Sequence, residues 1–252
     1  MTPLPLPRAP GALRAPPGLR LYGVVSLAAP GRLAVDGAAS SARARLHTPP
    51  LGTPAAEVLR VRDLGAVAAA ARYTPEPLTA ELVHGHRAVI EAVFAERAVL
   101  PAPPGALFRS RAALTAWMEL HAASLAEGLR FVEDCAEARV TAETGGAELG
   151  EVAGAADAVG LATEAFAALR REATALLVLR GDGSAGTTGG SGRAAVAEDA
   201  TFPAQAAFLV ERGRWQAFTQ AVALEGRRHP GLRLRCAGPW PPYSFVQLDF
   251  TG

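Results

Sequence analysis

The sequence reads Gly238-Pro239-Trp240-Pro241-Pro242-Tyr243-Ser244-Phe245-Val246 near the end of its 252 residues. Three prolines in four positions fix φ and remove three amide donors, so this segment is stiff and not helical. Each of its aromatic side chains buries on the order of 150–250 Å² when packed, which disfavours a tail lying free in water. The segment therefore either latches onto its own protein or grips another one.

We favour a latch formed by residues 239–252, with its aromatic side chains packed against two domains of the same chain. The residues expected to have a structural or interaction role are Gly238, Pro239, Trp240, Pro241, Pro242, Tyr243 and Phe245 in this segment, with His86, Pro101 and Gly105 earlier in the chain.

Length and composition exclude several classes of protein. A chain of 252 residues exceeds the usual size of one domain, which favours two. The formal net charge is only +1, and the arginines are scattered among nearly equal acids, so no basic stripe points to nucleic acid or a membrane surface. Two cysteines, Cys135 and Cys236, are too few for a disulfide framework and suit a reducing cytoplasm. No apolar run reaches the ~18 residues of a spanning helix.

The N-terminal part reads as a disordered proline-rich leader, 1–17, followed by a small α+β domain, 18–97. Alternation predicts a strand from Leu19, with Leu21, Gly23, Val25 and Leu27 on one face. Further strands are expected at Leu33–Val35, 43–47 and Glu57–Arg62. Residues 79–96 carry apolar side chains at helical spacing, with His86 on the apolar stripe.

Residues 98–238 are expected to form a modified ferredoxin-like domain of order βαββαβ. Its elements are an interrupted strand over 99–108, a helix capped by Ser110, a strand within 130–143, a helical insertion over 150–179, a flexible loop at 181–192, a strand over 206–210, a helix over 214–227 and a strand over 232–236. In the alternative arrangement, 150–179 supplies one of the regular helices. The predicted fold class is therefore α+β, with a small N-terminal antiparallel sheet and a ferredoxin-like second domain.

No motif nominates catalytic, cofactor-binding or metal-binding residues. Gly181 to Gly186 match G-x-G-x-x-G, but a glycine-rich linker follows where that fingerprint needs a helix. His84 and His86 stand two apart and do not share a face of a helix, so we interpret His86 as a hydrogen-bonded structural residue. Glu133, Asp134 and Glu137 are interpreted as a solvated acidic edge. We expect a protein that is not an enzyme and has no cofactor or small-molecule ligand.

The terminal segment resembles the C-terminal signature of the gas vesicle protein F/L family, and the resemblance covers most of the chain from Leu19 on. The opening strand Leu21 to Val25 is similar to that family's first strand. His86 matches the histidine that the family carries on a helix. Val99, Leu100 and Pro101 match its V-L-P segment, and Gly105, Leu107 and Phe108 match its glycine before a hydrophobic pair. One departure is Pro103-Pro104, where the family usually has Arg-Phe.

The resemblance implies a two-domain α+β accessory or minor structural protein of gas vesicle assembly. It would act in the cytoplasm in association with the vesicle. Its partners would be the small hydrophobic shell protein and other gas vesicle accessory proteins. Two other hypotheses are a ferredoxin-like module that senses small molecules, favoured by a deep polar pocket at His86 or His121, and an unrecognised hydrolase.

Overall fold

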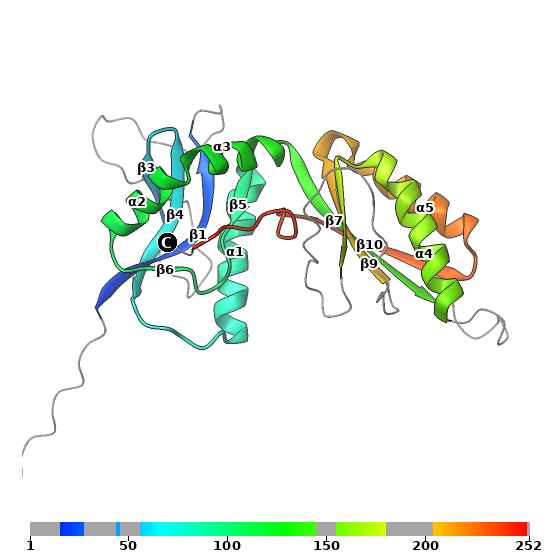
Figure 1. Cartoon of the computed structure of the whole chain (residues 1–252), viewed down its shortest axis with the longest axis horizontal. Coiled ribbons are helices and arrows are strands. Elements are labelled where there is room, and N and C mark those ends of the chain that lie inside the picture. The colour runs from blue at the N-terminus through cyan, green and yellow to red at the C-terminus, as the bar shows by residue number, and fades with distance from the viewer. Residues whose placement is uncertain (1–15, 28–43, 46–55, 145–154, 180–203, 251–252) are drawn as a thin grey trace, which may run out of the picture.

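The computed structural model describes residues 16–27, 44–45, 56–144, 155–179 and 204–250 (Figure 1). Most of the expected leader, the expected strand at Leu33–Val35 and the expected loop at 181–192 lie outside these residues. The described elements sort into two antiparallel sheets, each covered by helices (Figure 1). This confirms the predicted α+β class.

The first sheet has the order β2-β3-β4-β1-β5, and β6 also pairs with β1. Its strands are β1 (Pro17–Ser26), β2 (Ala44–Arg45), β3 (Glu57–Val61), β4 (Leu64–Arg72), β5 (Val99–Pro101) and β6 (Leu107–Phe108).

Helices cover both faces of this sheet. Helix α1 (Ala80–Glu96) begins after Thr79, whose hydroxyl accepts from the amide of Leu82 at 3.3 Å. It packs on one face, while α2 (Arg111–Leu120) and α3 (Ala122–Phe131) pack on the other. The predicted cap of α2 is confirmed, because the Ser110 hydroxyl accepts from the amide of Ala113 at 3.1 Å.

A β-bulge in β1 decides which side chains face which helix. The register with β4 shifts between Leu21 and Gly23, and one extra residue in a strand moves the later side chains to the opposite face. Leu21 and Val24 consequently share the core with α2 and α3, whereas Tyr22 and Val25 share the core with α1. The expected grouping of Leu21 with Val25 is wrong for this reason.

The second sheet has the order β10-β7-β9-β8, which is the strand arrangement of a ferredoxin-like βαββαβ unit. Helices α4 and α5 cover one face of it, with Ala162, Phe166 and Phe218 in the shared core. The elements in chain order are β7 (Cys135–Thr144), α4 (Ala155–Leu169), η1 (Arg170–Glu172), β8 (Ala175–Leu179), β9 (Ala204–Glu211), η2 (Arg212–Arg214), α5 (Trp215–Arg228) and β10 (Leu232–Trp240).

Three element assignments inside the ferredoxin-like unit are wrong, and one of them is the helix capped by Ser110, which packs on the first sheet. Val99–Pro101 belongs to the first sheet, where Pro101 pairs with Gly23. Helix α4 is one of the two regular helices rather than an insertion, and residues 175–179 form a strand. A strand of three residues is too short for its sequence to show a period. Alanine suits both buried and surface helices, so the alanine-rich sequence of α4 does not show whether this helix belongs to the regular fold. Only tertiary packing decides the places of Val99–Pro101 and of α4. We propose a domain division between Val132 and Cys135 instead of at residue 98.

The two halves meet through shared side chains. Trp215 at the start of α5 packs against both the second core and the α1 side of the first sheet. The Arg212 guanidinium donates to the carbonyl oxygen of Phe94 at 2.6 Å and lies 4.0 Å from the centroid of the Phe94 ring. This arginine thereby caps the C-terminal end of α1 from the second sheet.

Candidate functional site

The C-terminal segment after β10 crosses from the second sheet back to the first and ends beside α2 (Figure 1). Two tight turns start it: the amide of Tyr243 donates to the Pro241 oxygen at 2.7 Å, and that of Phe245 to the Pro242 oxygen at 3.2 Å. Pro241 and Pro242 are buried. We call residues 241–250 the tail.

Gly238 adopts a backbone conformation and a close packing, just before the tail, that a residue with a side chain would not allow. Its φ is +131°, a conformation that favours glycine. A Cβ there would lie 2.6 Å from the Glu137 carbonyl oxygen and 2.7 Å from Cη2 of Trp215. The close approach of Gly238 to β7 and α5 therefore requires the absence of a side chain.

Glu137 on β7 anchors the start of the tail. Its side chain is 0% exposed. Its Oε2 accepts from the amide of Ser244 at 2.7 Å, and its Oε1 accepts from the Ser244 hydroxyl at 2.8 Å and from Arg139 at 3.1 Å. A buried carboxylate is stable only when its lone pairs are satisfied in this way. The interpretation of Glu137 as part of a solvated edge is wrong, because the tail covers it.

The far end of the tail packs on the α2 and α3 side of the first sheet. The indole Nε1 of Trp117 donates to the carbonyl oxygen of Asp249 at 2.9 Å. The ring of Phe250 stacks on that of Trp117, with centroids 5.1 Å apart and an interplanar angle of 17°. The tail residues in contact with this core are Phe245, Val246, Leu248 and Phe250.

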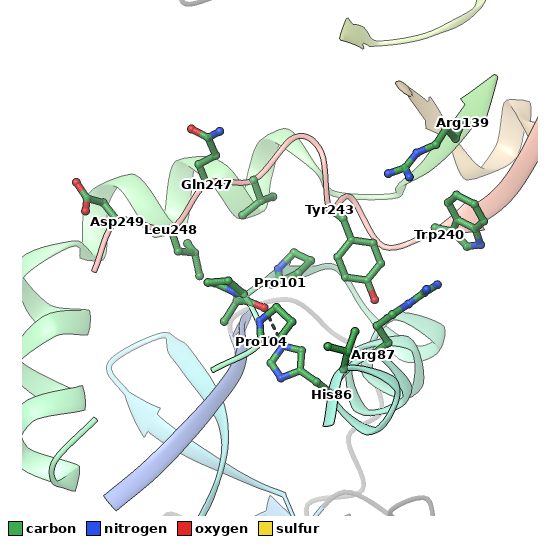
Figure 2. A pocket seen from close by; sticks show the side chains of 14 residues that line it. His86, Arg87, Pro101, Pro104, Arg139, Trp240, Tyr243, Gln247, Leu248 and Asp249 are labelled. Atoms are coloured by element: carbon green, nitrogen blue, oxygen red, sulfur yellow. Dashed lines mark hydrogen bonds between the residues drawn. The ribbon is translucent and has the colours of Figure 1, made fainter. Parts of the chain in front are cut away.

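A groove of about 850 Å³ lies between the tail, α1 and the loop after β5 (Figure 2). Four of the predicted site residues line it: His86, Pro101, Trp240 and Tyr243. They come from α1, β5, β10 and the tail, so the tertiary structure brings together residues that are up to 157 positions apart, as counted from His86 to Tyr243. The groove also contains Arg87, Arg139 and Asp249, so both signs of charge line it.

His86 joins α1 to the loop after β5. The side chain is 2% exposed, and its Nε2 lies 2.8 Å from the carbonyl oxygen of Ala102. A carbonyl only accepts, so Nε2 carries the proton. Burial lowers the pKa of His86, the bond to Ala102 opposes this, and the Arg20 charge adds to the lowering. The ring, which packs 5.1 Å from that of Tyr22, is therefore held neutral.

Tyr243 is the aromatic residue of the tail that faces α1. Its pKa is raised to about 12, first because it is buried and then because the charge of Glu91 lies nearby, while Arg87 opposes the shift. The phenol consequently stays protonated at physiological pH. Its ring packs against the core on the α1 side of the first sheet, and Figure 2 shows it directed towards Arg87.

The other predicted residues lie at separate places. Trp240 is half-buried and lines the groove, with the guanidinium carbon of Arg139 at 5.5 Å from its ring centroid. Phe245 packs into the core instead. Gly105 has φ +90° in the loop between β5 and β6 and lines a second groove.

Sequence reasoning missed the polar contacts that position the tail. Ser244 stands inside the quoted segment, but no local pattern pairs it with a carboxylate 107 positions earlier. Only the fold shows the indole of Trp117 on α2 bonded to the backbone of Asp249. The prolines before Tyr243 indicated the stiffness of the tail, not its partners.

Within the described residues, no group of three or more His, Cys, Asp or Glu side chains is arranged to hold a metal ion. None of the helices in the described ranges is long and apolar enough to cross a membrane.

Comparison with known sequences gives one family. A family model described as gas vesicle synthesis protein GvpL/GvpF matches residues 18–180 and 155–247. The chain is 28% identical to gas vesicle protein F2 of Halobacterium salinarum over 234 residues, which is 91% of this chain and 92% of that protein. A shorter match, 46% identical over 43 residues, covers 17% of this chain and 15% of gas vesicle protein L from a Streptomyces species.

Solved structures with the same fold include two gas vesicle proteins. The crystal structure of GvpF from Anabaena has a TM-score of 0.63 at 16% identity, covering 92% of this chain and 99% of that one. GvpF from Microcystis aeruginosa has a TM-score of 0.61 at 14% identity, with the same coverage. These likenesses establish the shared two-sheet architecture.

Proposed function

This chain belongs to the gas vesicle synthesis protein GvpL/GvpF family. We therefore propose that it is a non-enzymatic accessory or minor structural protein that binds the small hydrophobic shell protein during gas vesicle assembly. The observation that carries the proposal is the family match over residues 18–180 and 155–247. Membership supports an assembly role. The shell protein as partner and the absence of catalysis belong to our proposal.

The physical reason for such a protein lies in the shell itself. A subunit that polymerises into a water-excluding wall exposes apolar surface before it is incorporated, and exposed apolar surface and open strand edges lead to aggregation. A partner that covers this surface reversibly delivers the subunit in a soluble form. We place this activity in the cytoplasm at the growing vesicle, together with other gas vesicle proteins.

The tail residues and His86 have a structural role in this proposal. Glu137, Ser244 and Trp117 tie the tail to both sheets, which supports a latch that keeps the two halves in one orientation. An accessory protein with a fixed orientation presents a constant surface to its partners, and this lowers the entropic cost of binding.

Two experiments test the proposal. Deletion of the gene from a complete gas vesicle cluster should leave cells without buoyant vesicles, and the wild-type gene should restore them. An affinity-tagged chain should co-purify with the shell protein from cells that express the cluster. Buoyant vesicles in the deletion strain, or a purification free of every gas vesicle protein, would contradict the proposal.

The groove beneath the tail supports a second candidate, a module that binds a small molecule. Its mostly apolar lining carries a few polar side chains, among them His86, Arg87 and Tyr243, and this is the composition expected of such a site. A thermal-shift screen of the purified protein with small metabolites separates the two candidates. A stabilising ligand whose effect is lost in Tyr243→Phe or Arg87→Ala favours the module, and no shift favours the assembly role alone.

A further inference from the structure

Exposed apolar side chains gather around the second groove, which measures about 760 Å³. Among the described residues, the large hydrophobic side chains that are exposed are Tyr73, Leu78, Leu120, Phe131 and Leu224. Tyr73 and Leu120, exposed by 44% and 75%, line this groove. Leu78, exposed by 60%, lies against its rim, because its Cδ2 would be 3.5 Å from a Cβ on Gly105. Clustering of this kind marks an interaction surface.

The walls and floor of the groove are built from fixed aromatic rings. Phe108 on β6 and Trp117 on α2 lie 5.6 Å apart, and Phe250 of the tail completes the cluster at 6.0 Å from Phe108. Since the indole of Trp117 is also bonded to the tail backbone, the rings are ordered before any partner arrives. A preformed apolar surface binds with a smaller loss of entropy.

One charged side chain stands in this apolar lining. It is Arg109, which follows β6 and is exposed. No hydrogen bond or ion pair involves its side chain within the described part of the chain. A guanidinium at the rim of an apolar groove complements a partner that carries a carboxylate beside its apolar face.

The backbone beside the groove argues for a helix as the occupant. Pro103 and Pro104 line it and have no amide hydrogen to donate to an added strand. A helix needs no backbone bonds from its partner, and it presents side chains at i, i+3/i+4 and i+7 to a groove.

We propose that the groove lined by Tyr73, Trp117, Leu120 and Phe250 binds the apolar face of an amphipathic helix of the shell protein, with a carboxylate of that helix on Arg109. The inference rests on the proposed function, since that supplies the shell protein as partner. Leu120 and Tyr73 then supply apolar contacts, and Arg109 sets the direction in which the helix lies.

The test uses the full chain, affinity-tagged and co-expressed with the shell protein. Tyr73→Ser combined with Leu120→Ser should reduce the captured shell protein about tenfold or more, as expected when central apolar contacts are lost. Leu224→Ser is the matched control, because Leu224 is 40% exposed on α5, over the second sheet. Arg109→Glu should reduce capture and Arg109→Lys should retain most of it. Thermal melting of each variant verifies that it is folded.

A photocrosslinker at position 120 adds a direct readout. It should join the chain to the shell protein, and the same group at position 224 should not. Full capture by the folded double variant would overturn the groove as the site while leaving the proposed function intact. If the wild-type chain captures no shell protein, or if the crosslinker joins only two copies of this chain, the shell helix is not the occupant. The deletion strain then decides separately whether the assembly role stands.

Discussion

Ser244 in the tail donates twice to Glu137 on β7, from its amide to Oε2 at 2.7 Å and from its hydroxyl to Oε1 at 2.8 Å. Because the carboxylate is fully buried, these bonds replace the water that Glu137 would otherwise need. They fix the tail to the second sheet at the point from which it runs to the first. The start of the tail is therefore held by a contact between residues far apart in the sequence.

Removing this contact should destabilise the protein. Glu137→Ala leaves Arg139 and the Ser244 amide without their acceptor, and we expect a loss of about 3–5 kcal/mol in the free energy of unfolding. Ser244→Ala should cost about 1–3 kcal/mol. Urea denaturation measures both. Glu91→Ala is the control, since Glu91 is an exposed partner of Arg87 on α1 and should change stability by less than about 1 kcal/mol. Equal effects at Glu91 and Glu137 would contradict the anchor.

Gly238→Ala should weaken the start of the tail. The φ of +131° and the contacts with Glu137 and Trp215 leave no room for a methyl group, so we expect a loss of about 1–3 kcal/mol or more. Gly226→Ala on α5 is the matched control. A Cβ there would meet nothing within 4 Å, and alanine favours a helix by about 0.5–1 kcal/mol. Opposite shifts in melting temperature are the expected outcome, and shifts of the same sign would refute the argument.

Stability should fall in acid because of His86. Its folded pKa is lowered by burial, so the unfolded chain binds the proton more readily, near the usual pKa of about 6.5. The stability that the neutral His86 side chain gives to the folded protein is complete above about pH 6.5 and is lost as the pH falls towards the folded pKa. His86→Gln, which keeps a donor for Ala102, should flatten the dependence of unfolding free energy on pH between about 7.5 and 5.5. His84→Gln, on the exposed side of the same helix, should leave the wild-type slope, and a steep slope in His86→Gln would exclude His86 as its source.

The far end of the tail depends on Trp117. Trp117→Phe removes the donor to Asp249 and should cost about 0.5–1.5 kcal/mol, while Phe250→Ala removes the stacked ring and should cost about 1–3 kcal/mol. Hydrogen exchange should show faster exchange of the Phe245 amide, which donates to the Pro242 oxygen, in both variants. Unchanged protection of this amide would mean that the tail is held by other contacts.

Arg212 should matter more than its neighbour Arg214. Arg212→Ala loses the bond to the Phe94 oxygen and the contact with its ring. Because Arg212 is itself exposed, we expect a cost of about 1–1.5 kcal/mol. Arg214 is half-exposed and pairs with Glu172 on the surface, so Arg214→Ala should cost about 0–1 kcal/mol. Denaturant titration of both variants compares them, and equal values would argue against a cap on α1.

Much of the secondary structure was predictable because it depends on short windows of sequence. The apolar stripe of α1 includes Val89, Ile90 and Val93, and these side chains are buried. Ser110 caps α2 as expected. The strand at 232–236 also follows from local period, and the signature from Gly238 to Val246 led to the family.

Other features required the tertiary structure. The bulge after Leu21 reverses the faces of β1, Val99–Pro101 pairs with β1 rather than joining the second sheet, and Glu137 is buried rather than solvated. No short stretch of the sequence indicates any of these three features. The amino-acid sequence by itself determined the helices, most strands and the stiffness of the tail, because propensity and period act over a few residues. The tertiary structure alone decided which sheet a short strand joins and which carboxylate the tail covers, because pairing and burial depend on residues brought together from distant parts of the chain.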